Sequence, residues 1–277
     1  MLPNFLVIGG MKCGTTSLDH YLKAHPQISM PEKEVDFFSR NFDFGLDWYE
    51  SLFEKKNDRI KVFGETSVSY TKYPLHKGVP ERISSSFPNV KLIYVVRDPI
   101  QRIISHYMHN VYADAEDRSL ENILKDEGHE SLYVYFSLYY LQIEKYLEYF
   151  SENQFMIICS EDLRENNKRK TILKEIFRFL DVDATVQSTK FNEVKYETTK
   201  KGKKKGIAKW VSTLPFYETF VDISPTFLRA FYIRLFTEKL KPPILSDSLR
   251  DKLVNIIAPD TEKLRRFTGD DFASWSL

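Results

Sequence analysis

The hydrophobic pattern of the chain alternates between short continuous apolar runs and segments with helical spacing. Continuous runs are typical of buried strands in parallel sheets. They predict strands at residues 5–8, 60–63, 90–96 and 154–159. Apolar residues recur at helical spacing in the segments 15–22, 100–112, 137–150, 172–180 and 249–257. This alternation predicts an α/β fold in which helices flank a central parallel sheet on both faces.

Two later segments differ in composition. Residues 190–209 are basic, contain glycine and have few apolar side chains, which is typical of a solvated mobile loop. Residues 216–236 are rich in aromatics. They could form core, the wall of an acceptor pocket or a membrane-surface patch, and we favour core.

Length and charge limit the classes of fold and partner that the chain can have. A chain of 277 residues can bury a substantial core, and we expect one domain over residues 1–277. Because 40 Lys and Arg stand against 39 Asp and Glu, the formal net charge is +1, and nucleic acid is not the expected partner. Cys13 and Cys159 form no CxxC pair. With no signal peptide before the first strand and no bilayer-spanning run, a cytoplasmic protein is expected.

A glycine-rich turn joins the first predicted strand to the first predicted helix. Residues 9–17 read Gly-Gly-Met-Lys-Cys-Gly-Thr-Thr-Ser. Hydroxyls and backbone N–H groups at a helix start favour a bound phosphate or sulfate. The candidates for such a cradle are Lys12, Cys13, Gly14, Thr15, Thr16 and Ser17.

The turn differs from a Walker A loop in one position. Gly9 and Gly14 have that motif's spacing, but Thr15 stands where the motif has lysine, so ATP is not the expected ligand. Lys12 lies inside the loop, where its charge would stabilise a leaving phosphate without a metal ion. The alternative is a tight turn with a solvated lysine.

A second candidate anion site follows the strand at 90–96. Arg97 ends that strand and Ser105 lies on the next helix. A guanidinium and a hydroxyl suit a terminal phosphate dianion. Alternatively, Arg97 pairs with Asp98 at an ordinary helix start.

The loop at residues 9–17 resembles the 5′-phosphosulfate loop of sulfotransferases that use 3′-phosphoadenosine 5′-phosphosulfate (PAPS), especially the heparan-sulfate type and its bacterial relatives. The resemblance implies a P-loop-like three-layer sandwich, with PAPS as co-substrate and 3′-phosphoadenosine 5′-phosphate (PAP) as product. Arg97 and Ser105 match the family's 3′-phosphate element. Lys201 and Gly202 best match a late loop that folds over the nucleotide, although the pair at 205–206 competes.

Catalytic roles also follow from the resemblance. The segment 34–38 is similar to an element in which a glutamate is the general base, and Glu34 matches that glutamate; without this context its acidic neighbourhood would be a solvated surface. Lys12 would stabilise the transferring group, and Ser105 would contact Lys12 between turnovers. Many relatives have a lysine after the glutamate at position 65, where this chain has Thr66.

The expected reaction moves the sulfuryl group of PAPS to an acceptor hydroxyl, on a saccharide or another alcohol. No metal is implied, because no acidic residue is identifiable as a Walker B aspartate. Two alternatives are a metal-dependent nucleotide-kinase-like phosphotransferase and a non-catalytic nucleotide-binding module. The sequence leaves the acceptor and the oligomeric state open.

Overall fold

The computed structural model describes residues 2–32, 34–55, 57–193, 203–204, 237–238 and 240–277. A five-stranded sheet with the strand order β2-β3-β1-β4-β5 lies at its centre, and all four pairings are parallel. The strands are β1 (Phe5–Gly9), β2 (Ile28–Ser29), β3 (Val62–Thr66), β4 (Lys91–Val96) and β5 (Phe155–Cys159). This confirms the predicted parallel α/β class.

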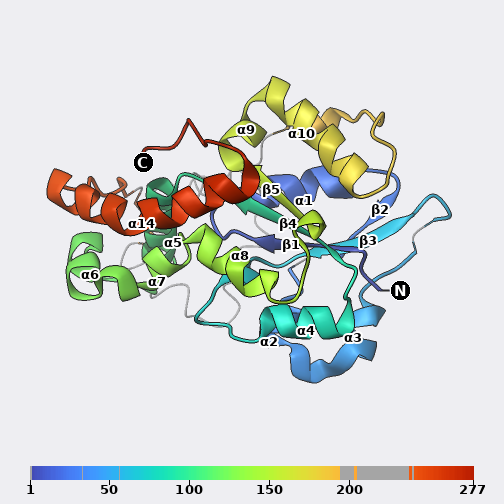
Figure 1. The fold of residues 1–277 in the computed structure, drawn as a ribbon, viewed down its shortest axis with the longest axis horizontal. Coiled ribbons are helices and arrows are strands. Elements are labelled where there is room, and N and C mark those ends of the chain that lie inside the picture. The colour runs from blue at the N-terminus through green and yellow to red at the C-terminus, as the bar shows by residue number, and fades with distance from the viewer. Residues whose placement is uncertain (1, 33, 56, 194–202, 205–236, 239) are drawn as a thin grey trace.

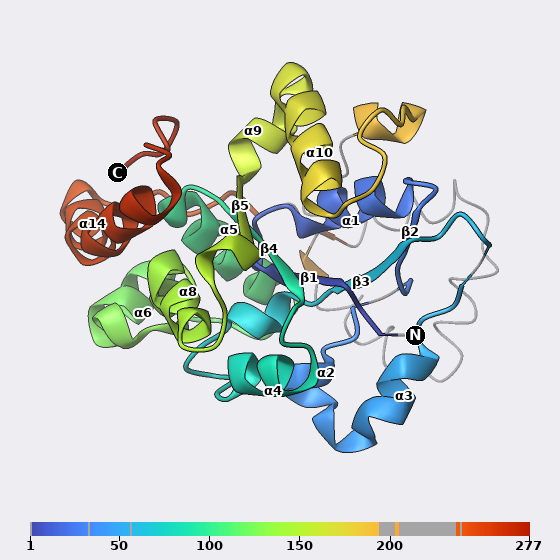
Figure 2. The same cartoon turned by 45° about the vertical axis from the view of Figure 1, so that its right-hand side comes forward.

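The helices divide between the two faces and one end of the sheet (Figures 1 and 2). On one face lie α1 (Thr15–Lys23), α9 (Ser160–Arg164) and α10 (Asn166–Phe179). On the other lie α2 (Phe37–Arg40), α3 (Gly45–Ser51) and α4 (Val79–Ser86), with α8 (Tyr139–Leu147) packed against α4. The sheet is therefore the middle of three layers.

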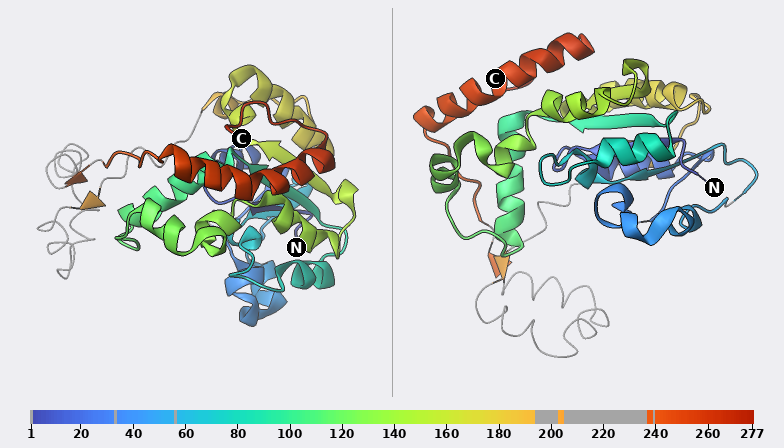
Figure 3. Two further views of the ribbon diagram at one scale, coloured as in Figure 1. Left: turned by 60° about the vertical axis from the view of Figure 1, so that its left-hand side comes forward. Right: turned by 60° about the horizontal axis from the view of Figure 1, so that its bottom comes forward.

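A second group of helices packs beside the sheet around its own apolar cluster. It consists of α5 (Pro99–Tyr112), α6 (Leu120–Asp126), α7 (Leu132–Tyr135) and α14 (Asp247–Thr268). The cluster joins Ile103 of α5 to Ile123 of α6, Val134 of α7 and Leu253 of α14. Figure 3 shows α14 along the outside of the molecule, and the short antiparallel pair β6 (Lys203–Lys204) and β7 (Thr237–Glu238) apart from the main sheet.

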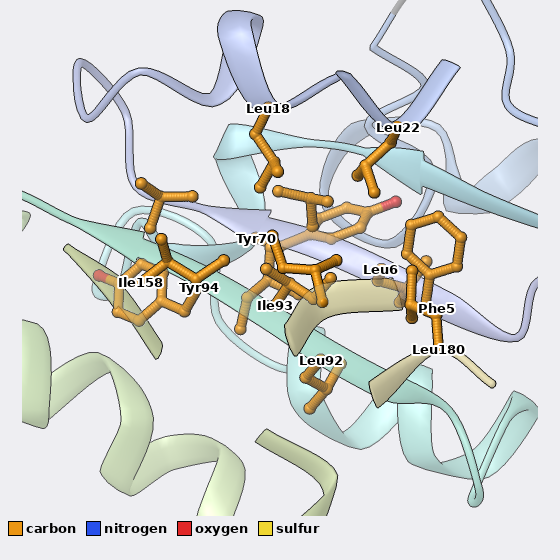
Figure 4. Packing of buried hydrophobic residues seen from close by; sticks show 14 of the residues in the cluster. Phe5, Leu6, Leu18, Leu22, Tyr70, Leu92, Ile93, Tyr94, Ile158 and Leu180 are labelled. Atoms are coloured by element: carbon orange, nitrogen blue, oxygen red, sulfur yellow. The ribbon is translucent and has the colours of Figure 1, made fainter. Parts of the chain in front are cut away.

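The centre of the sheet is buried on both faces, which explains the continuous apolar runs. Phe5 to Ile8 are fully buried, as are residues 92–96 of β4. Leu18 and Leu22 of α1 point toward these strands (Figure 4). Helical spacing thus places the apolar stripe of α1 on the sheet.

The strand predicted at 60–63 begins and ends later in the structure. Strand β3 runs from Val62 to Thr66, so it includes Gly64 and Glu65, which lie beyond the predicted end of the strand. At Gly64 a Cβ would lie 2.3 Å from the Phe5 ring, so only glycine lets the two strands pack here. Hydroxyl donors satisfy Glu65 in the interior, and the strand continues through a buried carboxyl group.

Candidate active site

A cavity of about 360 Å³ opens at the carboxyl ends of the strands. Each strand is followed by a residue of its wall: Lys12 after β1, Glu34 after β2, Lys72 after β3, Arg97 after β4 and Ser160 after β5. The strand order reverses at β1, between β3 and β4. Ligands of open α/β sheets bind in the crevice at such a switch point.

The glycine-rich loop forms one side of the cavity. Gly14 has φ of 93°, and a Cβ there would lie 3.3 Å from Ser160 Oγ, so glycine suits both the backbone and the contact. The first turn of α1 closes on Gly14, whose carbonyl accepts the N–H of Ser17 at 3.0 Å. Thr15 and Thr16 line the cavity as the first residues of α1, and in the described chain no acceptor takes their N–H groups. This is the geometry of an anion cradle.

Most of the predicted site residues meet in this cavity. Its wall contains Lys12, Gly14, Thr15, Thr16, Ser17, Glu34, Arg97 and Ser105. Lys201 and Gly202 lie outside the described residues, as does the aromatic segment 216–236.

Cys13 does not line the cavity. Its N–H donates to the Gly10 carbonyl at 3.1 Å, and its thiol lies 3.6 Å from the Tyr139 hydroxyl in the core. Burial raises the pKa of the thiol to about 11. The Cys13 side chain therefore holds the loop against α8, and its N–H is used within the loop.

Arg97 turns toward the loop and away from its sequence neighbour. Its Nη1 donates to the Lys12 carbonyl at 3.3 Å, and its Nε lies 4.0 Å from Glu161 Oε1. Asp98 instead caps α5, accepting the N–H of Gln101 at 3.0 Å. The pairing of Arg97 with Asp98 is not formed, and Arg97 and Ser105 face one cavity.

Glu34 and Asp36 stand in the wall that follows β2. Burial in this wall, and then the nearby charge of Asp36, raise the pKa of Glu34 to about 7, while the charge of Lys72 opposes the shift. Asp36 is held in place: its carboxylate accepts from Ser69 and lies 3.7 Å from Arg40 Nη1. A carboxyl group that titrates near neutrality and faces an anion cradle is suited to general base catalysis.

The buried carboxyl group of Glu65 is hydrogen-bonded to the segments that carry this wall. Glu65 accepts hydrogen bonds from Tyr49 at 2.8 Å, Tyr70 at 2.5 Å and Ser67 at 2.6 Å. The Ser67 hydroxyl in turn accepts the N–H of Asp36 at 2.8 Å. Burial raises the pKa of Glu65, and the three hydroxyl donors oppose the rise. The acidic loop is thereby tied to β3.

Several wall residues carry no motif that predicts them, namely Arg40, Lys72, His109, Ser160 and Arg164. For three of them the available signal is position, because Lys72, Ser160 and Arg164 follow the carboxyl ends of β3 and β5. Thr66 donates to Asp19 Oδ1 at 3.1 Å and is not part of the wall.

Fold and cavity together define an α/β protein with a candidate anion site at the switch point of its sheet. Residues 2–218 match the family model of the sulfotransferase domain. Because the match covers more than half of the chain, the protein belongs to the sulfotransferase family.

Individual relatives agree with this assignment. The chain is 40% identical over 109 residues to the membrane-associated sulfotransferase kil1 of Dictyostelium discoideum, which covers 38% of this chain and 22% of that protein. It is 30% identical over 171 residues to human heparan sulfate glucosamine 3-O-sulfotransferase 3B1, covering 58% of this chain and 42% of that protein. The chain thus spans less than half of either relative.

A solved structure shares the fold over the whole chain. The sulfotransferase from Alicyclobacillus acidocaldarius matches with a TM-score of 0.69 at 24% identity, covering 100% of both chains. This likeness confirms the P-loop-like α/β architecture. Among the residues that the structure describes, no helix combines the length and apolarity needed to cross a membrane.

Proposed function

We propose that the protein is a PAPS-dependent sulfotransferase that sulfates a hydroxyl group of a saccharide. The observation that carries the proposal is one cavity that holds an anion cradle with Lys12, the pair Arg97 and Ser105, and the near-neutral carboxyl group of Glu34. The cradle would bind the 5′-phosphosulfate, and Arg97 with Ser105 the 3′-phosphate. Glu34 then faces the acceptor.

The proposed reaction needs few groups. The acceptor oxygen forms a bond to sulfur while the bond between sulfur and the 5′-phosphate oxygen breaks. Glu34 takes the acceptor proton, and the charge left on the phosphate is met by Lys12 and the N–H groups at the start of α1. Ser105 would contact Lys12 between turnovers. These groups supply the positive charge, so the transfer as proposed requires no metal ion.

A second cavity supports an acceptor path to Glu34. It has a volume of about 540 Å³, shares Glu34 with the first cavity and is lined by Trp48 and Pro31. The half-buried Trp48 offers an aromatic surface beside the base, of the kind on which a sugar ring can pack. The human relative acts on heparan sulfate glucosamine by its name, and a saccharide acceptor is proposed here on both grounds.

A cytoplasmic location is a further part of the proposal. It rests on cysteine usage, because both thiols are free and buried. The single domain over residues 1–277 also stays a prediction.

Nucleotide preference tests the proposed function. Calorimetric titration without magnesium should show PAP binding about 100-fold more tightly than adenosine 5′-monophosphate, because each charge-assisted hydrogen bond to the 3′-phosphate contributes about 1.5 to 3 kcal/mol. Arg97→Ala should remove most of the difference and leave the monophosphate's affinity nearly unchanged. Arg59→Ala, at an exposed position away from the cavity, is the control. Equal affinities for the two nucleotides, or tighter binding of ATP with magnesium, would contradict the proposal.

A further inference from the structure

Lys72 carries a buried positive charge into the same cavity. It directly follows the short 3₁₀ helix Val68–Thr71, which leads away from β3. Its side chain is part of the cavity wall with Glu34, and only 8% of the residue is exposed. Lysine is rarely buried to this extent without a partner.

Among the described residues, no acceptor or carboxylate lies within bonding distance of the Lys72 ammonium. Other cations of the wall are held in place: Arg97 donates to the Lys12 carbonyl, and Arg40 pairs with Asp36. Burial, followed by the charge of Arg40, lowers the pKa of Lys72, while the charges of Asp36 and Glu34 oppose the shift. Burying an unpaired ammonium lowers the stability of the folded protein, and a bound anion would offset that cost.

The surroundings of Lys72 indicate which anion it would meet. Lys72 and Glu34 both line the first cavity, and the charge of each shifts the pKa of the other. A base that deprotonates an acceptor must lie beside the acceptor oxygen, which in turn approaches the sulfur atom from the side opposite the leaving phosphate. The anion next to Glu34 would therefore be the sulfonate, whereas Lys12 lies in the loop that would hold the phosphate.

We propose that Lys72 binds the sulfonate oxygens of PAPS from the acceptor side and so acts as a second catalytic lysine. This inference rests on the proposed function. Lys12 stabilises the phosphate end of the breaking bond, and Lys72 holds the group in transfer against Glu34. The sulfonate is negatively charged both on PAPS and on the sulfated product, so a fixed cation on the acceptor side can contact it before and after the transfer.

Comparison of PAP with PAPS isolates the contact, because the two nucleotides differ only in the sulfonate. Without acceptor, Lys72→Met should bind PAP as the unmodified protein does and bind PAPS about 10- to 100-fold more weakly. Lys72→Arg should retain part of the PAPS affinity. Lys77→Met is the matched control, since Lys77 lies five positions further on, is exposed and does not line the cavity.

Each outcome separates the two proposals. Normal PAPS binding by Lys72→Met, or an equal loss of affinity for PAP and PAPS, overturns the role of Lys72. The first result would indicate that Lys72 contacts the acceptor instead of the sulfonate. If the unmodified protein does not prefer PAP to the monophosphate, the proposed function itself fails.

Stability measurements separate a ligand contact from a structural role. Since the ammonium has no partner to lose within the described chain, Lys72→Met should melt at the same temperature as the unmodified protein or higher. Lys72→Gln gives a second neutral side chain for the same titrations should the Met variant not fold. A marked loss of stability in both variants would show that the ammonium holds the fold together and would overturn the proposal.

Discussion

Glu34 owes its ionisation near neutral pH to its place in the cavity wall. Burial raises its pKa to about 7, Asp36 adds to the rise and Lys72 opposes it. A base acts in its ionised form, so turnover should increase as pH rises through about 7 and then level off. Glu34→Gln should lower turnover about 100- to 10,000-fold while PAP still binds. The measurement is kcat/KM from acid to mildly alkaline pH.

Two further variants check the origin of that pH profile. Lys72→Met should move the midpoint to higher pH, because the charge of Lys72 lowers the pKa of Glu34. Glu32→Gln should leave the profile unchanged, since Glu32 lines only the neighbouring cavity. A midpoint that persists in Glu34→Gln would assign the base to another residue.

The sequence predicts individual site residues where a local motif carries them. Lys12 and the hydroxyl residues at the start of α1 could be found because loop and helix are contiguous in the chain. Cys13 shares the motif, but its orientation depends on Tyr139, which no local pattern reveals. Lys72 belongs to no recognisable motif, and only its position after the carboxyl end of β3 could have indicated that it lines the cavity.

At the scale of elements, burial decides what the sequence reveals. Strands β1 and β4 are covered on both faces, and their apolar runs predict them nearly residue for residue. Strand β2 has two residues, too few to form a pattern. In β3, Glu65 interrupts the apolar run, and three hydroxyl groups satisfy its carboxyl group: those of Ser67 and Tyr70, which follow closely in the chain, and that of Tyr49 in α3. A buried carboxyl group satisfied in this way breaks the hydrophobic pattern that would predict a strand.

Helix α8 depends on a cap from a distant part of the chain. No side chain at its own N-terminus caps it. Instead, Asp260 of α14 accepts the N–H of Tyr140 at 2.9 Å and that of Leu141 at 2.8 Å. Asp260→Ala should lower the free energy of unfolding by about 1 to 3 kcal/mol, because two partly buried donors lose their acceptor. Urea denaturation measures the change.

Asp251→Ala provides the control for this cap. Asp251 lies on the same helix and is exposed, so its loss should change stability by less than about 0.5 kcal/mol. Equal effects of the two substitutions would show that the helix as a whole, and not the cap, determines the stability.

At the scale of the whole molecule, the cavity joins segments that are far apart in the chain. Residues that follow all five strands contribute to its wall, so a ligand there would contact segments that are attached to every strand of the sheet. The cluster of α5, α6, α7 and α14 also takes part, because α5 carries Ser105. A bound nucleotide should therefore stabilise the sheet and the neighbouring helices together.

Thermal unfolding with PAP tests this coupling and the prediction of one domain over residues 1–277. At a PAP concentration 100 times its dissociation constant, binding adds about 2.7 kcal/mol to stability, which raises the Tm of a chain of this size by roughly 5 to 10 °C. If Arg97→Ala weakens binding about 100-fold, the same concentration adds only about 0.4 kcal/mol and shifts Tm by about 1 °C.

A single calorimetric transition that moves as a whole would support one cooperative unit. Two transitions, of which PAP moves only one, would show that the apolar cluster of α14 unfolds separately from the sheet, which contradicts the single domain. An equal shift of Tm with adenosine 5′-monophosphate would contradict the assignment of Arg97 and Ser105 to a 3′-phosphate.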